Sequence, residues 1–250
     1  MAVFGPHAVG CACGCGVPRA GRRAALAGLG ALALAAPPVA SRARAQTLTR
    51  AARDAMTPDQ VIADMKAGNA RFRAGDRRER DIGAQRAAAY GGQYPKAVLL
   101  SCIDSRAPAE FLFDMSIGDI FNSRIAGNVA DVAVLGGLEF ACKLAGAKLV
   151  LVMGHTKCGA VVGAVAGAQL GNLTALLAMI APAVPATSFS GARTAENYAF
   201  VDAVARTNVE LTVQGIRRQS PVLAEMEQQG AIRIAGAMYD LSTGAVEFLT

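Results

Sequence analysis

Residues of the kind that bind soft metal ions follow two apolar segments of this 250-residue chain. Cys102 comes directly after segment 96–101 (KAVLLS), and His155 and Cys158 follow segment 148–154 (KLVLVMG). Two thiolates and an imidazole form a ligand set that suits zinc. Three protein ligands leave one tetrahedral position of the metal open, which is typical of catalytic zinc sites. The pattern therefore predicts a catalytic zinc centre, whereas each residue taken alone could be an ordinary core residue.

An acidic and a basic residue lie close to the first of these ligands. Asp104 is placed to accept a hydrogen bond from water on the metal, and Arg106 can bind Asp104 through two parallel hydrogen bonds. That pairing would keep Asp104 off the metal; without it, Asp104 could become a fourth ligand and close the site. Zinc lowers the pKa of bound water to about 7, so an open site could deliver hydroxide to an electrophilic carbon. The alternative for this pair is a simple salt bridge in a loop.

Both apolar segments have the length and the Val and Leu content of buried β-strands. If they are parallel neighbours, the three ligands converge at the carboxyl edge of the sheet, where open α/β sheets bind ligands. Further strands are expected at 119–125, 231–239 and 246–249, and helices alternate with strands along the chain. The sequence therefore predicts an α/β fold: a single domain with a mostly parallel β-sheet flanked by helices.

The first two expected helices precede the first strand. Thr57 as N-cap, Pro58 at the first helical position and Gly75-Asp76 at the end define the first of them. The two helices form an N-terminal helical arm that could pack on a partner subunit; alternatively, they cover the edge of their own sheet. The helices are expected at 57–74, 77–89, 108–114, 130–145, 159–171, 172–181, 195–218 and 220–228, with a loop at 182–194.

Residues 1–45 have the composition of an export signal. Arg22-Arg23 precede the uncharged apolar stretch 24–36, and Ala43-Arg44-Ala45 before Gln46 is typical of a cleavage site. The stretch is short for a membrane span, and the arginine pair resembles that of a twin-arginine signal. We therefore expect cleavage, a periplasmic or secreted domain over 46–250, and no membrane association afterwards. The alternatives are a membrane anchor or a disordered tail.

The net charge and the number of cysteines differ between the expected export signal, residues 1–45, and the rest of the chain. Five of the 25 basic residues lie in 1–45, so the rest of the chain carries 20 basic and 19 acidic residues. No nucleic-acid partner is expected, because no long basic run with interleaved aromatics remains. Residues 46–250 contain three cysteines, too few for a disulfide framework, and Cys142 is expected to be a small buried apolar residue.

The motifs Cys102-Ile-Asp-Ser-Arg106 and Gly154-His155-Thr-Lys-Cys158-Gly159 resemble those of the β-class carbonic anhydrases. The similarity runs from about Gly92 to Val165 and continues more loosely to the C-terminus. The resemblance implies an α/β fold, Zn2+ on the two cysteines and the histidine, and the Asp104–Arg106 dyad. It also implies a dimer whose active site lies near the subunit interface.

The resemblance further implies which residues contact the substrate. Gln93 occupies the position of the substrate-orienting glutamine, and the backbone N–H of Gly159 would lie near the substrate. Phe121, Ala126 and Phe140 occupy positions that line the apolar CO2 pocket. The chain departs from the family at Lys157, where an acidic or small residue is common. It also contains no Trp, so an inhibitory bicarbonate site that uses Trp is not expected.

The function expected from these observations is zinc-dependent, reversible hydration of CO2 to bicarbonate and a proton by a homodimer or higher homo-oligomer. One alternative is a COS or CS2 hydrolase on the same zinc site, which would release sulfide. Another is a non-catalytic zinc-binding homologue in which Asp104 closes the site. A third uses Cys158 as nucleophile and His155 as base, but it leaves Cys102 and Asp104 without a role.

Overall fold

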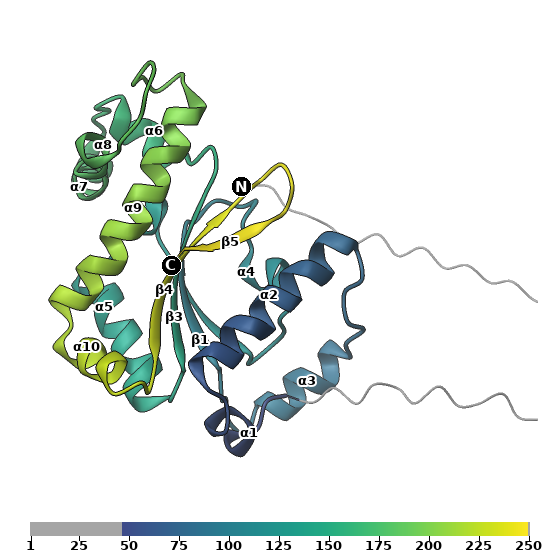
Figure 1. The fold of residues 1–250 in the computed structure, drawn as a ribbon. Coiled ribbons are helices and arrows are strands. Elements are labelled where there is room, and N and C mark those ends of the chain that lie inside the picture. Colours follow the sequence, from purple (N-terminus) through teal and green to yellow (C-terminus); the bar gives the residue numbers. More distant parts are fainter. Residues whose placement is uncertain (1–46, 250) are drawn as a thin grey trace, which may run out of the picture. The chain divides into compact units, whose positions relative to one another are not determined.

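The structure is a computed structural model that describes residues 47–249. The predicted export signal, residues 1–45, lies outside the described residues. Five strands form one sheet in the order β2-β1-β3-β4-β5 (Figure 1). The first four in this order are parallel to their neighbours, and β5 runs antiparallel to β4, which confirms the predicted mostly parallel sheet. The strands are β1 (Ala97–Ser101), β2 (Ile120–Arg124), β3 (Leu149–His155), β4 (Arg233–Tyr239) and β5 (Val246–Leu249).

Helices and helical turns connect the strands. They are α1 (Arg50–Asp54), α2 (Pro58–Ala74), α3 (Ile82–Ala89), α4 (Ala109–Leu112), η1 (Ala126–Asn128), α5 (Val132–Glu139), η2 (Phe140–Leu144), α6 (Gly159–Val165), α7 (Gly171–Ile180), α8 (Ala183–Ala186), α9 (Tyr198–Gln219) and α10 (Pro221–Gln228). None of the described helices is both long and apolar enough to cross a membrane.

Helices cover both faces of the sheet, with α5, α9 and α10 on one side and α2 and α4 on the other (Figure 1). Every residue of β1 and β3 is therefore buried, which explains why these strands are continuous apolar runs. Along β1, Val98 and Leu100 belong to the core beneath α9, whereas Ala97 and Leu99 belong to the core beneath α2. Packing on both faces holds β1 and β3 in place, and the predicted ligands follow the carboxyl ends of these two strands.

The first long helix, α2, has the ends that the sequence predicts. The Thr57 hydroxyl accepts from the backbone N–H of Gln60, and the Gln60 side chain accepts from the N–H of Thr57, which is a complete capping box. Gly75 ends the helix with a left-handed φ of 71°. Val61 and Met65 of α2 are fully buried on the sheet. Within its own chain, α2 therefore covers a face of the sheet rather than its edge.

The expected helix at 77–89 is only half correct, because α3 begins at Ile82. Asp81 caps α3 by accepting from the N–H of Ala84. The preceding residues are drawn instead to the buried carboxylate of Asp114, which Arg80 contacts at 2.5 Å and Arg77 at 3.6 Å. These ion pairs with a residue more than 30 positions away in the sequence replace the first turns of the expected helix.

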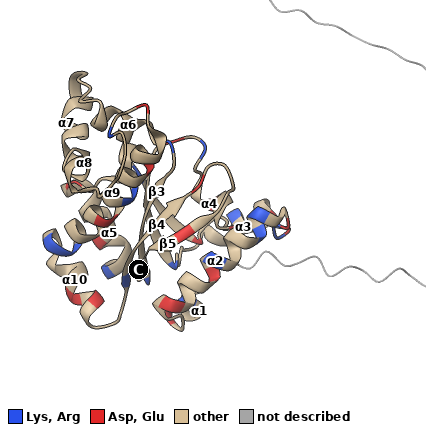
Figure 2. Ribbon diagram, turned by 45° about the horizontal axis from the view of Figure 1, so that its top comes forward, with Lys and Arg blue, Asp and Glu red and all other residues tan. Residues whose placement is uncertain are grey.

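Three other expectations differ in detail from the structure. The helix expected at 130–145 consists of α5 followed by the π-helical segment η2. The helix expected at 159–171 ends at Val165, and Gly167 then adopts a left-handed φ of 64°. The loop expected at 182–194 contains the short helix α8. Neither α6 nor α7 carries a charged residue, and both are uniformly tan in Figure 2.

Candidate metal centre

The predicted ligands Cys102, His155 and Cys158 lie together at the carboxyl edge of the sheet. The Sγ atoms of the two cysteines and one ring nitrogen of His155 lie within 4.8 Å of one another, and all three residues are buried. Ser101 pairs with Met153 in the parallel ladder between β1 and β3, so Cys102 leaves β1 beside the last two residues of β3. Cys158 follows as the N-cap of α6. The convergence expected from two parallel neighbouring strands is thus present.

The geometry of this cluster fits a tetrahedral zinc ion. The two Sγ atoms are 3.9 Å apart and both cysteines are free thiols; thiolates about 2.3 Å from a tetrahedral zinc would lie about 3.8 Å apart. His155 Nδ1 lies 2.9 Å from the carbonyl oxygen of Thr156, which leaves Nε2 to face the cysteines. Among the described residues Nε2 has no hydrogen-bond partner although it is buried. A metal ligand bond would satisfy that nitrogen.

Electrostatics within the cluster favour an ionised ligand. The hydrogen bond from the Cys158 thiol lowers the pKa of Cys102 to about 4, and the nearby His155 ring and the Gly127 N–H act in the same direction against the effect of burial. The same sulfur–sulfur contact, together with burial, raises the pKa of Cys158. One thiolate is therefore available in the absence of metal, and a divalent cation would favour the second.

Asp104 and Arg106 form the ion pair that the sequence predicts. Arg106 Nε donates to Asp104 Oδ1 at 2.9 Å and Nη2 donates to Oδ2 at 2.7 Å, and the backbone N–H of Arg106 also donates to Oδ1. The Arg106 guanidinium holds the pKa of Asp104 at about 2. Asp104 Oδ2 lies 3.8 Å from His155 Nε2. The carboxylate is therefore ionised, engaged by Arg106 and directed toward the metal-binding cluster.

Arg124 is a further residue of the site, for which the sequence alone predicts no role. Its Nε donates to the carbonyl oxygen of Cys102 at 3.0 Å, and its Nη2 donates to the carbonyl oxygen of Asp104 at 2.6 Å. Arg124 reaches both because it ends β2 directly opposite Ser101 of β1. The sequence feature that could have indicated this role is the position of Arg124, a basic residue at the carboxyl end of a neighbouring parallel strand.

The residues expected to bind substrate divide into two groups. Ala126 and Gly159 adjoin the cluster: Ala126 precedes Gly127, whose N–H points at Cys102 Sγ at 3.4 Å, and Gly159 follows Cys158. The other group is Gln93, Phe121 and Phe140.

The second group lies toward the amino end of β1. Gln93 precedes this strand, and Phe121 pairs with Val98, which is four residues or about 13 Å of strand before Cys102. Phe140 packs against Phe121 with ring centroids 6.2 Å apart. A single chain therefore does not bring these three residues to its own metal-binding cluster.

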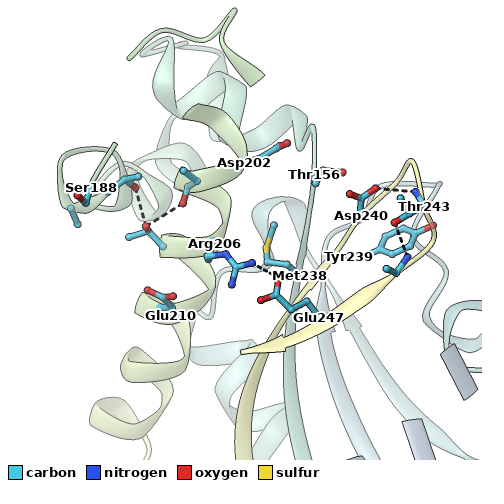
Figure 3. A pocket seen from close by; sticks show the side chains of 15 residues that line it. Thr156, Ser188, Asp202, Arg206, Glu210, Met238, Tyr239, Asp240, Thr243 and Glu247 are labelled. Carbon is cyan, nitrogen blue, oxygen red and sulfur yellow. Dashed lines mark hydrogen bonds and ion pairs between the residues drawn. The ribbon is translucent and has the colours of Figure 1, made fainter. Parts of the chain in front are cut away.

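A pocket of about 670 Å³ lies behind the turn that bears His155 and Cys158, between α9 and the β4–β5 hairpin (Figure 3). Thr156 and Asp202 line it, and an ion pair between Arg206 and Glu247 spans it. None of the three predicted ligands is among its lining residues. This pocket is therefore separate from the metal-binding cluster.

Comparison with known proteins agrees with the family that the motifs resemble. The family model described as "Carbonic anhydrase" matches residues 97–246. Carbonic anhydrase 2 of Mycobacterium tuberculosis is 36% identical over 186 residues, covering 72% of this chain and 87% of that protein. Carbonic anhydrase of Mycolicibacterium smegmatis is 35% identical, with 73% and 89% covered.

Solved structures of β-carbonic anhydrases share the fold. CafA of Aspergillus fumigatus superposes with a TM-score of 0.59 at 25% identity, covering 76% of this chain and 89% of that one. A tetrameric β-carbonic anhydrase of Sordaria macrospora superposes with a TM-score of 0.58 at 22% identity, with 76% and 97% covered. The α/β fold of this chain is thus shared with known β-carbonic anhydrases. The chain belongs to the β-class carbonic anhydrase family.

Proposed function

We propose that this protein catalyses the zinc-dependent, reversible hydration of CO2 to bicarbonate and a proton. The observation that carries the proposal is the buried cluster of Cys102, His155 and Cys158 with the Asp104–Arg106 ion pair beside it. The relatives that match most of the chain are named carbonic anhydrases. A protein that only stored or bound zinc would need neither the open ligand set nor a bidentate partner for Asp104.

The residues of the cluster and those beside it would have different roles in this reaction. Cys102, His155 and Cys158 would hold the metal, and bound zinc supplies a Lewis acid that makes hydroxide available near neutral pH. Asp104 is ionised and its orientation is fixed by Arg106, so it can accept a hydrogen bond and fix the direction of attack. The backbone N–H of Gly159, at the start of α6, would bind an oxygen of the substrate.

A second copy of the chain would complete this site. Gln93, Phe121 and Phe140 are the proposed substrate-orienting and pocket residues, and they lie at the opposite end of β1 from the chain's own cluster. The outer surface of α5 and η2 around Phe140 is exposed and mostly apolar, with Val132 at 85% and Leu144 at 76%, and it includes the exposed Lys143. Such a surface is typical of an interface between subunits. This supports a homodimer or higher homo-oligomer, and the Sordaria macrospora relative is tetrameric.

The proposed enzyme acts outside the cytoplasm. The proposal rests on residues 1–45, whose arginine pair, uncharged apolar stretch and Ala-Arg-Ala motif are typical of a cleaved export signal. Mass spectrometry of the protein isolated from its native host tests this. A chain that begins near Gln46 supports export and cleavage, and an intact N-terminus in cytoplasmic fractions would contradict them.

Stopped-flow measurement of CO2 hydration, with sulfide release from COS and CS2 measured in parallel, tests the reaction itself. We expect fast hydration near neutral pH and little sulfide. Rapid sulfide release with poor CO2 hydration would instead favour the COS or CS2 hydrolase, which uses the same ligands.

A further inference from the structure

The long helix α9 lies very close to β3, which leads to two of the ligands, and to the neighbouring strand β4. Val209 of α9 packs over Gly154 of β3 and Gly236 of β4. A Cβ atom at Gly154 would lie 2.7 Å from Val209 Cγ2, and one at Gly236 would lie 2.8 Å from Val209 Cγ1. Two glycines in neighbouring strands therefore form a notch for Val209, and this brings α9 within hydrogen-bond reach of the segments that bear the ligands.

From this position, Asn208 of α9 supports the Cys102 side of the cluster. Asn208 is only 3% exposed, and its Nδ2 donates to the carbonyl oxygen of Gly127 at 2.8 Å. Gly127 has a left-handed φ of 70°, and a Cβ atom there would overlap with Ile180 Cδ1. The N–H of the same glycine points at Cys102 Sγ at 3.4 Å. Asn208 thus holds the residue whose backbone donor faces a ligand sulfur.

Asp202 of α9 supports the other side of the cluster. Its Oδ1 accepts from the backbone N–H of Lys157 at 2.7 Å. Lys157 lies between His155 and Cys158 and adopts a left-handed φ of 54°, which is uncommon for a residue other than glycine. Figure 3 shows Asp202 on α9 near Thr156, at one side of the pocket behind this turn. Asp202 thus fixes the backbone that sets the spacing between two ligands.

We infer that Asn208 and Asp202 are positioning residues of the metal centre, and that α9 sets the geometry between Cys102 and the His155–Cys158 turn. The two residues are six positions apart on one rigid helix, about 9 Å along its axis. Each contacts the backbone of a ligand-bearing segment, and neither is a metal ligand. The inference rests on the proposed function, in which this cluster binds zinc. Outer contacts of this kind orient ligands and commonly change metal affinity by about 10- to 100-fold when removed.

The test compares Asn208→Ala, Asp202→Ala and Asp202→Asn with the parent protein and with a control, Thr207→Val. Thr207 is the neighbour of Asn208 on α9, and its hydroxyl contacts Thr187 and the Ala203 carbonyl oxygen rather than the cluster. Zinc affinity is measured by competition with a chelator, and the absorption spectrum of the Co2+-substituted protein reports ligand geometry.

We expect zinc affinity to fall by about 10-fold or more in Asn208→Ala and Asp202→Ala, with altered cobalt–thiolate absorption. Asp202→Asn retains an oxygen acceptor for the Lys157 N–H, so it should keep the parent affinity and spectrum. Thr207→Val should also keep both, even where it lowers the free energy of unfolding.

Parent-like zinc affinity and cobalt spectra in both alanine variants would overturn the inference, because the two contacts would then serve helix packing alone. An Asp202→Asn variant as impaired as Asp202→Ala would overturn it for Asp202, because charge rather than hydrogen bonding would be responsible. Asp202 is only half-buried, so its variants should fold even if Asn208→Ala does not. A parent protein that binds no zinc would overturn the proposed function and this inference together.

Discussion

Arg106 binds both carboxylate oxygens of Asp104, at 2.9 Å to Oδ1 and 2.7 Å to Oδ2, while Oδ2 lies 3.8 Å from His155 Nε2. The carboxylate is thus close to the metal-binding cluster but engaged elsewhere. Because a free carboxylate at this position could become a fourth ligand, the ion pair decides whether the proposed site is open or closed.

Replacing Arg106 with Ala should therefore close the site. The pKa of Asp104 would rise from about 2 toward its ordinary value, yet the group would stay ionised at neutral pH and free to bind the metal. We expect CO2 hydration to fall by about 10- to 100-fold while zinc content is retained. Arg106→Lys should also be impaired, because Lys cannot form the bidentate pair. Arg86→Ala, at an exposed arginine of α3, is the control. Full activity in Arg106→Ala would show that the pair is a simple loop salt bridge.

Proton release should depend on the buffer. His155 is the only histidine in residues 46–250, and the proposal uses it as a ligand. No second imidazole of that segment is therefore available to carry protons to solvent. We expect the turnover number to rise with buffer concentration at constant pH and ionic strength until chemistry becomes limiting. A turnover number that stays constant across the buffer series would require a proton acceptor within the protein.

Gly127 should tolerate no side chain. It combines a left-handed φ of 70° with a space that Ile180 already fills. In Gly127→Ala, backbone strain of about 1–2 kcal/mol adds to overpacking of about 1–3 kcal/mol in the free energy of unfolding. Gly167→Ala is a matched control, because Gly167 has φ 64° and nothing within 4 Å of its Cβ position. Urea unfolding of the two variants measures the difference, and equal losses would contradict the packing argument.

The buried carboxylate of Asp114 should make stability sensitive to acid. Burial alone would raise its pKa, but hydrogen bonds from Arg80 and Arg71 lower it to about 2. Because the folded-state pKa lies below the ordinary value of 3.8, this contribution to stability is complete above about pH 4 and is lost as the pH falls toward 2.

The substitution Asp114→Asn should therefore cost about 3 kcal/mol in the free energy of unfolding at neutral pH. That cost should shrink as the pH falls from about 4 to about 2, because the parent carboxylate is then protonated as well. Urea unfolding of both proteins across this range measures it. If the loss in the free energy of unfolding were the same at all pH values, the charge of Asp114 would make no contribution to stability.

The sequence was informative wherever local pattern and chemistry agreed. The apolar segments 96–101 and 148–154 predict β1 and β3 to within about one residue at each end, because both strands are covered on both faces. Their parallel pairing then brings Cys102 to His155. The capping box of α2 is likewise a local signal that the structure confirms.

Features that depend on distant partners could not be predicted in the same way. Residues 77–80 resemble a polar helix in sequence, but Asp114 holds them in another conformation. Asn208 carries no motif, and its contact with Gly127 follows from helix docking. The contact of Arg124 with the Cys102 segment depends on the strand order, which the sequence does not show. Phe121 pairs with Val98 and lies, like Gln93, away from the chain's own cluster. In the proposed oligomer a second copy would bring them to a cluster.

The most direct test of the central claim measures zinc content and stopped-flow CO2 hydration on the same samples of parent, Cys158→Ser and Cys142→Ser protein. Cys142 is a matched control, because it is buried and free like Cys158 but lies outside the cluster. We predict about one zinc per chain and fast hydration in the parent and in Cys142→Ser, and loss of both in Cys158→Ser. Zinc-loaded parent protein that hydrates no CO2 at any pH up to about 9, where hydroxide on a zinc site would be abundant, would contradict the account.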